Sequence, residues 1–425
     1  MKVFNSTLKL LIFLLLASCG GGGGGSITTG GNSPPLSRVA NQSVSNNLVQ
    51  NLATGDLNGD GLDDVVIGGW NSDAPTATIS ILIQNSDGTL TDKTSTLLPG
   101  SNVYGGSQHS FIADFNNDGK NDIFLPGFGD GVQEYPRNGV VLWNTGSGFT
   151  RSNLPEQTMS HGACVDDING DGFLDVLVAG GYSGSVGGIY INNGNQTFTL
   201  NQNALVSVTG SNFFSACSVI HENNGNIDIL FGNTGNVNGY RNNIVVFDSN
   251  LNVLSNTGLN QMDGNGHSLT GGDLIDSIAI DVNGDRHKDF VPIYNMIGAN
   301  GTPAFAGDIA AKRILLWTSA GQYTYSTTID NNYENLYFAF QTSIGGIPSV
   351  FFGGSNDQAV LYQVINGSFV GYKNQRFTDM AIQAGIPNPT QINFAIDSSV
   401  IYQNTSTQSV FMLQLLNGVW YTQKM

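Results

Sequence analysis

The stretch Asp167-Ile168-Asn169-Gly170-Asp171-Gly172-Phe173-Leu174-Asp175 decides the fold of this chain. It carries oxygen-bearing side chains at loop positions 1, 3, 5 and 9 and runs directly into the apolar residues Val176-Leu177-Val178. Alternate residues of a tight loop point inward, so these side chains can surround a hard cation such as Ca²⁺ with oxygen atoms. A short apolar run bounded by turn residues is typical of a β-strand. The pattern therefore predicts a calcium-binding turn between two strands.

The same nine-residue pattern occurs three more times, and each copy is followed by an apolar run. In each copy we expect four side chains and the backbone carbonyl of position 7 to bind one structural ion, about four Ca²⁺ in all, because Ca²⁺ takes about six to eight oxygen ligands in proteins. The candidate metal ligands are Asp56, Asn58, Asp60, Leu62 and Asp64; Asp114, Asn116, Asp118, Lys120 and Asp122; Asp167, Asn169, Asp171, Phe173 and Asp175; and Asp281, Asn283, Asp285, His287 and Asp289.

Two other interpretations of these loops have to be weighed. An EF-hand needs a bidentate Glu at position 12 and helices on both sides. Position 12 here is Ile67, Leu125, Val178 or Pro292, and predicted strands follow the loops, so the sequence excludes an EF-hand. A solvated turn without metal stays open. It stays open most of all for the fourth copy, where Arg286 replaces a glycine and brings a positive charge close to the ion.

A second pattern, a strand pair joined by a Gly- or Asn-containing turn, recurs seven times and predicts seven β-hairpins. The predicted hairpins span residues 81–88, 140–148, 189–194, 244–252, 314–321, 360–367 and 411–418. The chain contains 56 glycines and only 11% charged residues, a composition that favours many short strands joined by turns. No internal linker interrupts the repeats, so we expect seven copies of one unit in a single body.

The repeated acidic loop between strands resembles the FG-GAP/VCBS family, whose best-known members are the α-integrin propellers. The segment from Phe377 to Ile386 also resembles the inter-blade segment of bacterial members. The resemblance spans roughly residues 45–425. It implies an all-β fold, a seven-bladed β-propeller of four-stranded antiparallel blades, in which the acidic loop joins the first two strands of a blade and binds calcium. We carry this role to the four matching loops only.

Three copies of the unit depart from the acidic pattern, and we expect them to bind no ion. In the copy at residues 220–228, Ile220 stands at position 1 and Glu222 at position 3. The copy at residues 341–349 has no carboxylate, and the loop around residues 395–399 is reduced to a tight turn.

The N-terminus indicates export and lipid anchoring. Residues 1–9 form a short basic region, and residues 10–16 form an apolar run that is too short to span a bilayer. The following Leu16-Ala17-Ser18-Cys19 resembles the lipobox of bacterial lipoproteins. This resemblance implies a lipidated Cys19 and an outer-membrane lipoprotein of the bacterial cell envelope, periplasmic or surface-facing. An ordinary secretory signal with a stray cysteine is the alternative.

These features predict three segments. We expect a lipoprotein signal peptide over residues 1–18, a Gly/Ser/Pro-rich flexible tether over residues 19–46, and the propeller over residues 47–425.

The charge balance limits the partners of the protein. Without Lys2 and Lys9 of the predicted signal peptide, 13 basic residues face 32 acidic ones, a net charge of −19. Such a surface argues against nucleic acid and against anionic membranes, so we expect membrane contact through the lipid anchor only. The loop carboxylates would repel one another without calcium, so we expect folding and metal binding to be coupled.

Two further cysteines, Cys164 and Cys217, lie three residues before the first loop position of adjacent copies. An oxidising compartment would permit a disulfide between them. Inner strands of adjacent blades are often too far apart for the Cα separation of about 4.4 to 6.8 Å that a disulfide requires. We therefore favour two small buried packing residues over a disulfide.

The favoured function is a binding or adhesion module, expected to be a monomer, for a protein or glycan ligand at a propeller rim. No catalytic residue is assigned. A saccharide-processing enzyme, similar to polysaccharide lyases and using His109 and His161, is one alternative. We favour a structural hydrogen bond inside the propeller for these histidines and for His267. The other alternative is a scaffold subunit of an envelope complex.

Overall fold

The fold was derived from a computed structural model. It describes residues 36–39, 48–49, 52–68, 70–71, 77–100, 102–107, 109–127, 137–158, 160, 162–180, 187–205, 214–232, 242–259, 273–295, 314–325, 336–344, 347–354, 358–365, 368–376, 399–404, 406–407, 409–416 and 419–424. The chain divides into two units, Met1–Ser33 and Pro34–Met425. The predicted signal peptide and Cys19 lie outside the described residues. No helix within the described ranges is long and apolar enough to cross a membrane.

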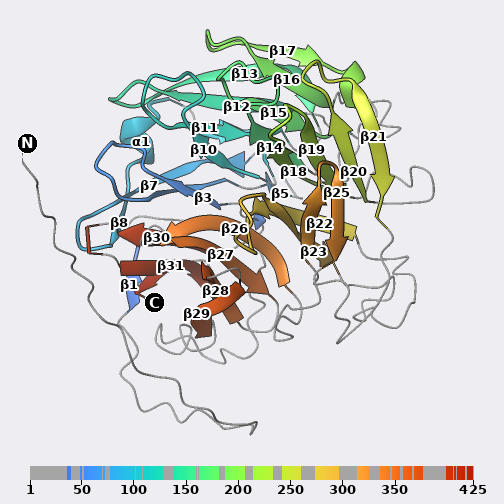
Figure 1. Cartoon of the computed structure of the whole chain (residues 1–425). Helices are drawn as coiled ribbons and strands as arrows, with labels where there is room; N and C mark the ends of the chain where they lie inside the picture. Colours follow the sequence, from blue (N-terminus) through green and yellow to red (C-terminus); the bar gives the residue numbers. More distant parts are fainter. Residues whose placement is uncertain are drawn as a thin grey trace, which may run out of the picture. The chain divides into compact units, whose positions relative to one another are not determined.

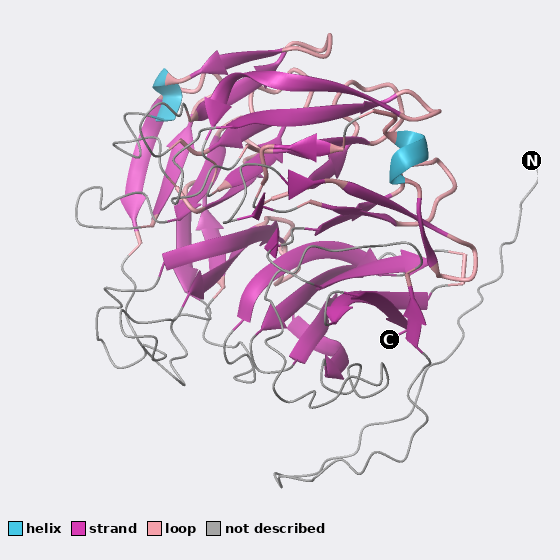
Figure 2. Ribbon diagram, turned by 180° about the vertical axis from the view of Figure 1, so that it is seen from behind, coloured by secondary structure: helices cyan, strands magenta, loops and turns pink. Residues whose placement is uncertain are grey.

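Strands account for nearly all the regular structure of the second unit (Figure 2). Six four-stranded antiparallel sheets follow one another along the chain, each with its strands in sequence order. Their strands are β3 (Leu52–Gly55), β4 (Asp64–Ile67), β7 (Ser80–Gln84) and β8 (Leu90–Asp92) in the first sheet; β10 (Phe111–Ala113), β11 (Asp122–Leu125), β12 (Arg137–Asn144) and β13 (Phe149–Thr158) in the second; β14 (Ala163–Asp166), β15 (Asp175–Val178), β16 (Gly188–Asn192) and β17 (Phe198–Asn201) in the third; β18 (Ala216–His221), β19 (Ile227–Gly232), β20 (Asn243–Phe247) and β21 (Val253–Gly258) in the fourth; β22 (Asp273–Ile280), β23 (Asp289–Asn295), β24 (Leu315–Ser319) and β25 (Gln322–Tyr325) in the fifth; and β26 (Leu336–Ile344), β27 (Ile347–Gly354), β28 (Gln358–Ile365) and β29 (Ser368–Arg376) in the sixth.

The last four-stranded sheet joins the two ends of the second unit. Its strand order is β1-β32-β31-β30, with bounds β1 (Leu36–Arg38), β30 (Ser399–Asn404), β31 (Ser409–Leu416) and β32 (Val419–Lys424). β1 pairs with β32 in antiparallel register, Leu36 opposite Gln423 and Arg38 opposite Tyr421. Residues 36–38, inside the segment predicted as a tether, therefore form a strand of this C-terminal sheet.

Smaller elements complete the regular structure described. They are the strand pair β2 (Leu48–Val49) with β5 (Trp70–Asn71), the strand pair β6 (Ala77–Thr78) with β9 (Val103–Tyr104), the short helix α1 (Thr94–Leu97) and helical residues 203–205 (Figure 2). The seven predicted hairpins are all present, at the strand pairs β7–β8, β12–β13, β16–β17, β20–β21, β24–β25, β28–β29 and β31–β32.

The core lies between the faces of consecutive sheets. Every residue of β4, β11, β15 and β19 is buried, because the second strand of each sheet has a neighbouring sheet on both faces. Between the second and third sheets, Phe124 and Trp143 pack in one cluster with Val176 and Tyr190. A fully buried side chain of this kind contributes about 1.5 to 3 kcal/mol relative to exposure. The continuous apolar runs after each loop therefore bind the sheets to one another.

Contacts between sheets follow the order of the chain (Figure 1). β3 contacts β10, β14 contacts β18, β18 contacts β22 and β22 contacts β26, while β3 also contacts β30 of the C-terminal sheet. Asp63 and Gln403 tie the first sheet to the C-terminal one, since each backbone N–H donates to the other residue. Successive four-stranded antiparallel sheets in contact are the arrangement of a β-propeller. The all-β propeller fold is thus confirmed, while the number of blades stays a prediction.

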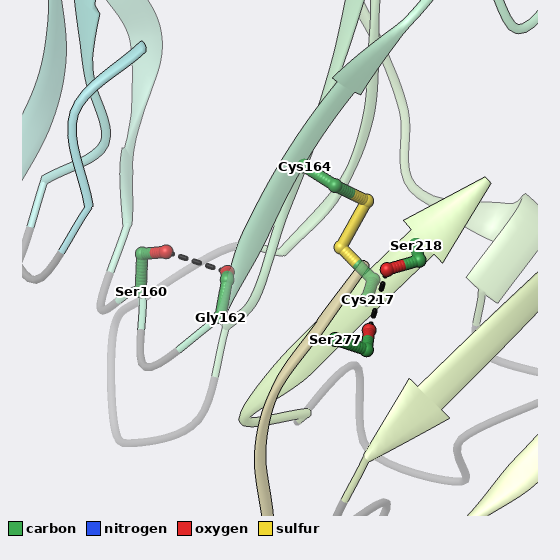
Figure 3. Close-up of a disulfide and its surroundings, with 6 residues drawn as sticks. All are labelled: Ser160, Gly162, Cys164, Cys217, Ser218 and Ser277. Atoms are coloured by element: carbon green, nitrogen blue, oxygen red, sulfur yellow. Dashed lines mark hydrogen bonds between the residues drawn. A yellow bond between two sulfur atoms is a disulfide. The ribbon is translucent and has the colours of Figure 1, made fainter. Parts of the chain in front are cut away.

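The structure contains the disulfide that the sequence disfavoured (Figure 3). Cys164 on β14 and Cys217 on β18 are bonded, with their Cα atoms 5.7 Å apart. The prediction of unpaired cysteines is wrong because these first strands lie against each other rather than apart. Adjacent residues of a strand face opposite sides. Ser218 accordingly turns the other way and shares a 2.5 Å hydrogen bond with Ser277 of β22.

Candidate metal centres

The four acidic loops lie where the sequence predicts them, between the first and second strands of their sheets. They connect β3 to β4, β10 to β11, β14 to β15 and β22 to β23. In all four sheets the loop therefore occupies the same topological place.

The loop of the third sheet folds around its own side chains. The backbone N–H groups of Asp171 and Gly172 donate to the Asp167 carboxylate at 3.0 and 2.9 Å. The N–H of Asp171 also donates to Asn169 Oδ1 at 2.9 Å, and the N–H of Phe173 donates to Asp171 Oδ1 at 2.9 Å. These contacts hold the oxygens of positions 1, 3 and 5 inside the turn.

The other three loops repeat three of these four contacts. The backbone N–H of position 6 donates to the side-chain carboxylate of position 1. The pairs are Gly61 to Asp56 (2.8 Å), Gly119 to Asp114 (2.8 Å) and Arg286 to Asp281 (3.0 Å). The backbone N–H of position 5 donates to the side-chain oxygen of position 3. The pairs are Asp60 to Asn58 (2.9 Å), Asp118 to Asn116 (3.0 Å) and Asp285 to Asn283 (2.9 Å). The backbone N–H of position 7 donates to the side-chain carboxylate of position 5. The pairs are Leu62 to Asp60 (2.8 Å), Lys120 to Asp118 (3.0 Å) and His287 to Asp285 (2.8 Å). The four loops therefore share one conformation.

Positions 4 and 6 of every loop adopt a left-handed backbone. In the third loop these are Gly170 and Gly172, with φ of 73° and 91°. A residue without Cβ adopts this conformation at no steric cost. The fourth loop instead holds Arg286 at φ 75°, which costs roughly 1 kcal/mol.

The carboxylate at position 9 connects each loop to its sheet. Asp175 is fully buried, and its Oδ2 accepts the N–H of Ile168 at 3.0 Å while its Oδ1 accepts the N–H of Asn192 on β16 at 2.8 Å. The equivalent pairs of donors are Leu57 and Gln84 for Asp64, Phe115 and Asn144 for Asp122, and Val282 and Trp317 for Asp289. One side chain thus joins the loop, the second strand and the third strand.

Burial raises the pKa of these carboxyl groups. Loss of solvent raises the pKa of Asp175 to about 6, and the charge of Asp171 adds to the rise. The pKa of Asp64 rises to about 7, and the pKa values of Asp122 and Asp289 rise to about 6, for the same reasons. Each loop carries three carboxyl groups, at positions 1, 5 and 9. Carboxylate oxygens are the hard donors that suit Ca²⁺.

The side chains at positions 3 and 5 also contact each other. The Asn amide donates to the Asp at position 5 in three loops, as in Asn169 to Asp171 at 2.8 Å, and Lys120 Nζ contacts Asp118 at 3.0 Å in the second loop. Within the described part of the chain, no three Asp, Glu, His or Cys side chains converge as metal ligands. Cation binding at the predicted ligands therefore requires the side-chain contacts of position 5 to open, so that the oxygens of positions 1, 3, 5 and 9 point at one ion.

Neighbouring loops lie side by side. Asn121 Nδ2 in the second loop donates to the carbonyl of Asp56 in the first at 2.8 Å. Asn117 Nδ2 donates to the carbonyl of Gly172 in the third at 2.7 Å. The tips of these three neighbouring loops, including Asp60, Asp118 and Asp171, are exposed, and we call them the acidic rim.

A set of three buried carboxamides, which the sequence analysis missed, ties the C-terminal sheet and the first two loops to the sheet that follows each of them. Asn192 Nδ2 donates to the carbonyl of Phe115 in the preceding sheet at 2.7 Å and to that of Leu174 in its own loop at 3.0 Å. Asn144 bridges Leu57 and Asn121 in the same way, and Gln84 bridges Gln403 and Asp63. Each carboxamide follows an apolar run on the third strand, and a polar residue at the end of that run is the signal that could have revealed it.

The remaining candidate positions behave differently. The copy at residues 220–228 forms a tight turn, in which Glu222 N–H donates to Asn226 and Gly225 N–H donates to Glu222. In the sixth sheet Ile344 pairs directly with Ile347, which leaves no space for a nine-residue loop. The His109 ring stacks on Phe111 with centroids 6.2 Å apart. His161, His267 and residues 395–398 lie outside the described residues.

Sequence comparison identifies a known repeat in the first part of the chain. Residues 19–125 match the family model of the FG-GAP-like repeat, and this stretch contains the first two acidic loops. The resemblance to FG-GAP repeats is thus confirmed for these residues. The search of curated proteins returns no match.

Several solved structures resemble the chain in fold. The crystal structure of BBS1N in complex with ARL6DN, soaked with mercury, has 10% identity and a TM-score of 0.48 and covers 92% of this chain and 96% of its own. The Dos1 propeller has 12% identity and a TM-score of 0.41, covering 86% and 76%. YCF48 from Cyanidioschyzon merolae has 10% identity and a TM-score of 0.43, covering 92% and 98%.

Proposed function

We propose that this chain is a lipid-anchored, calcium-binding β-propeller of the cell envelope whose acidic rim binds a protein or glycan ligand. The observation that carries the proposal is the common conformation of four acidic loops, three of which lie in adjacent sheets and contact one another. A shared local structure maintained in several sheets points to a shared ligand for each loop.

The proposed cation ligands are the side chains at positions 1, 3, 5 and 9 and the carbonyl at position 7. A bound Ca²⁺ would supply the positive charge that the three carboxyl groups of each loop lack. The position 9 carboxylates then stay ionised although they are buried, and they keep both backbone N–H donors. The role of the ion is structural, because position 9 fixes the second and third strands to the loop.

Calorimetric titration of the chelator-treated protein with Ca²⁺ tests this role. We expect about four ions per chain and a melting temperature that rises with calcium, since a site occupied at about a thousandfold excess over Kd stabilises by about 4 kcal/mol. Asp171→Asn should remove one ion. Asp87→Asn, in an exposed hairpin turn outside the loops, should remove none. A melting temperature unchanged by EGTA would overturn the calcium proposal.

The proposed ligand surface is the acidic rim. A partner with basic groups, or a saccharide whose hydroxyl groups reach a bound cation, suits such a surface. A protein and glycan array probed with the calcium-loaded chain tests recognition. Binding should be lost with EGTA and weakened by Asp171→Asn but not by Asp87→Asn. Binding that survives all three treatments would place the ligand elsewhere, and absence of any binding would contradict a binding module.

The proposed anchor is Cys19. The disulfide between Cys164 and Cys217 supports export, because disulfides persist in oxidising compartments. Labelling of cells with radioactive palmitate, followed by membrane fractionation, tests the anchor. Wild-type protein should carry label and sediment with outer membranes, whereas Cys19→Ser should carry none. Equal labelling of both forms would contradict the lipobox assignment.

A further inference from the structure

The fourth sheet keeps the buried acid of position 9 but gives it new partners. Asp228 on β19 is fully buried. Its Oδ2 accepts the N–H of Gly321 at 3.0 Å and the hydroxyl of Tyr323 at 2.8 Å, and both donors belong to the fifth sheet. In the third sheet the equivalent Asp175 accepts three N–H groups, from Ile168, Asn169 and Asn192 of its own sheet. Asp228 therefore links two sheets.

The other oxygen of Asp228 lacks a donor. Asp228 Oδ1 has no hydrogen-bond partner among the described residues, although it is shielded from water. The carboxyl group of Glu222, 8% exposed, lies within hydrogen-bonding reach of Asp228. Glu222 Oε1 accepts the indole N–H of Trp317 from the fifth sheet at 2.7 Å. Two carboxylates can only accept hydrogen bonds, so a proton on one of them supplies the missing donor.

We propose that Glu222 and Asp228 share one proton, and that this protonated pair, which accepts hydrogen bonds from the fifth sheet, stands where other sheets have an acidic loop. The turn offers a cation little else, because Ile220 stands at position 1. The titratable groups facing Asp228 are Glu222 from the turn and Tyr323 from β25, and Asp289 of β23 lies near Tyr323. Each of these groups is acidic, so a proton is the charge that they lack.

The shared proton makes this contact depend on pH. Burial, followed by the charge of Glu222, raises the pKa of Asp228 from 3.8 to about 6. The folded chain then binds the proton more tightly than the unfolded chain does. The contribution to stability is complete below the unfolded pKa and falls as the pH rises to about 6. The contribution of this pair to the stability of the folded chain is therefore greatest in mild acid and smallest above about pH 6.

The substitution Asp228→Asn tests the proposal in the calcium-loaded full chain. The amide oxygen can keep Gly321 and Tyr323 as donors, while the amide N–H₂ supplies Glu222 with a permanent donor. We expect the variant to melt about 3 °C above wild type at about pH 8, and to match wild type near pH 5, where Asp228 is protonated. Glu222→Gln should show the same pattern, since its amide oxygen can still accept from Trp317.

Asp175→Asn is the matched control. Both oxygens of Asp175 accept backbone N–H groups. In Asp175→Asn the amide N–H₂ would point at one of these N–H donors, so the variant should have a lower melting temperature at both pH values. Asp228→Asn and Glu222→Gln that also melt lower at both pH values would overturn the proposal. Calorimetry that finds one Ca²⁺ fewer in Asp228→Asn than in wild type would overturn it too, because a cation would then occupy the place of the proton.

Discussion

The third and fourth sheets bury the same acid at the same point and satisfy it in different ways. In the third sheet the nine-residue loop turns its own N–H groups toward Asp175. In the fourth sheet β18 continues to His221, which still pairs with Ile227, so the short turn leaves Asp228 to find its donors in the fifth sheet. The length of the loop therefore decides whether a buried carboxylate is bound by its own sheet or by the next.

We expect the largest effect from removal of calcium, which should reverse the pH dependence of stability. In EGTA-treated protein the position 9 acids have raised pKa values, about 6 for Asp175 against 3.8. The folded state then holds more protons than the unfolded state, so stability falls as the pH rises from about 4 through these raised pKa values. With calcium these groups stay ionised in the folded state, so stability should instead fall as the pH drops below about 4, the unfolded pKa. Urea unfolding across this range measures both slopes, and equal slopes would contradict calcium binding.

Loss of the disulfide should separate the third sheet from the fourth. Cys164 and Cys217 are 53 residues apart in sequence, and a cross-link closing a loop of that length stabilises by about 4 kcal/mol. Cys164→Ser and Cys217→Ser should each lower the free energy of unfolding by about that amount. The double variant should resemble either single one. Additive losses in the double variant would mean that the cysteines act by packing rather than through their bond.

Asn192→Ala tests the carboxamide between the second and third sheets. The change removes hydrogen bonds to the carbonyls of Phe115 and Leu174 and leaves both without that donor. Equilibrium unfolding should show a loss of about 2 kcal/mol. The neighbouring Asn193→Ala, an exposed residue that donates to Thr197, should cost less than about 0.5 kcal/mol. Similar losses of stability in both variants would show that the hydrogen bonds of Asn192 between sheets contribute no more than the exposed hydrogen bond of Asn193.

Arg286→Gly should have the smallest effect and the opposite sign. The left-handed backbone of Arg286, φ 75°, becomes unstrained with glycine, which gains about 1 kcal/mol. The mirror experiment is Gly172→Ala at φ 91° in the third loop, which should lose about 1 kcal/mol. Thermal unfolding in EGTA compares them without a metal contribution. A loss from Arg286→Gly would indicate that the arginine side chain stabilises its loop.

Local patterns made the loops and hairpins predictable. The contacts within each acidic loop join residues at most seven apart, and the left-handed positions 4 and 6 hold glycine except at Asn117 and Arg286. The hairpins likewise depend on alternation and turn residues close in sequence. For these features the nine residues of one loop make nearly all the interactions that fix its conformation.

The sequence by itself determined the repeated strand pairs and the acidic turns between them, because short-range sterics and hydrogen bonds govern both. Only the tertiary structure decided the Cys164–Cys217 bond, the pairing of β1 with β32 and the partners of Asp228. Each of these depends on how two distant sheets approach each other. That approach is set by the apolar side chains packed between the sheets, whose fit no local pattern encodes.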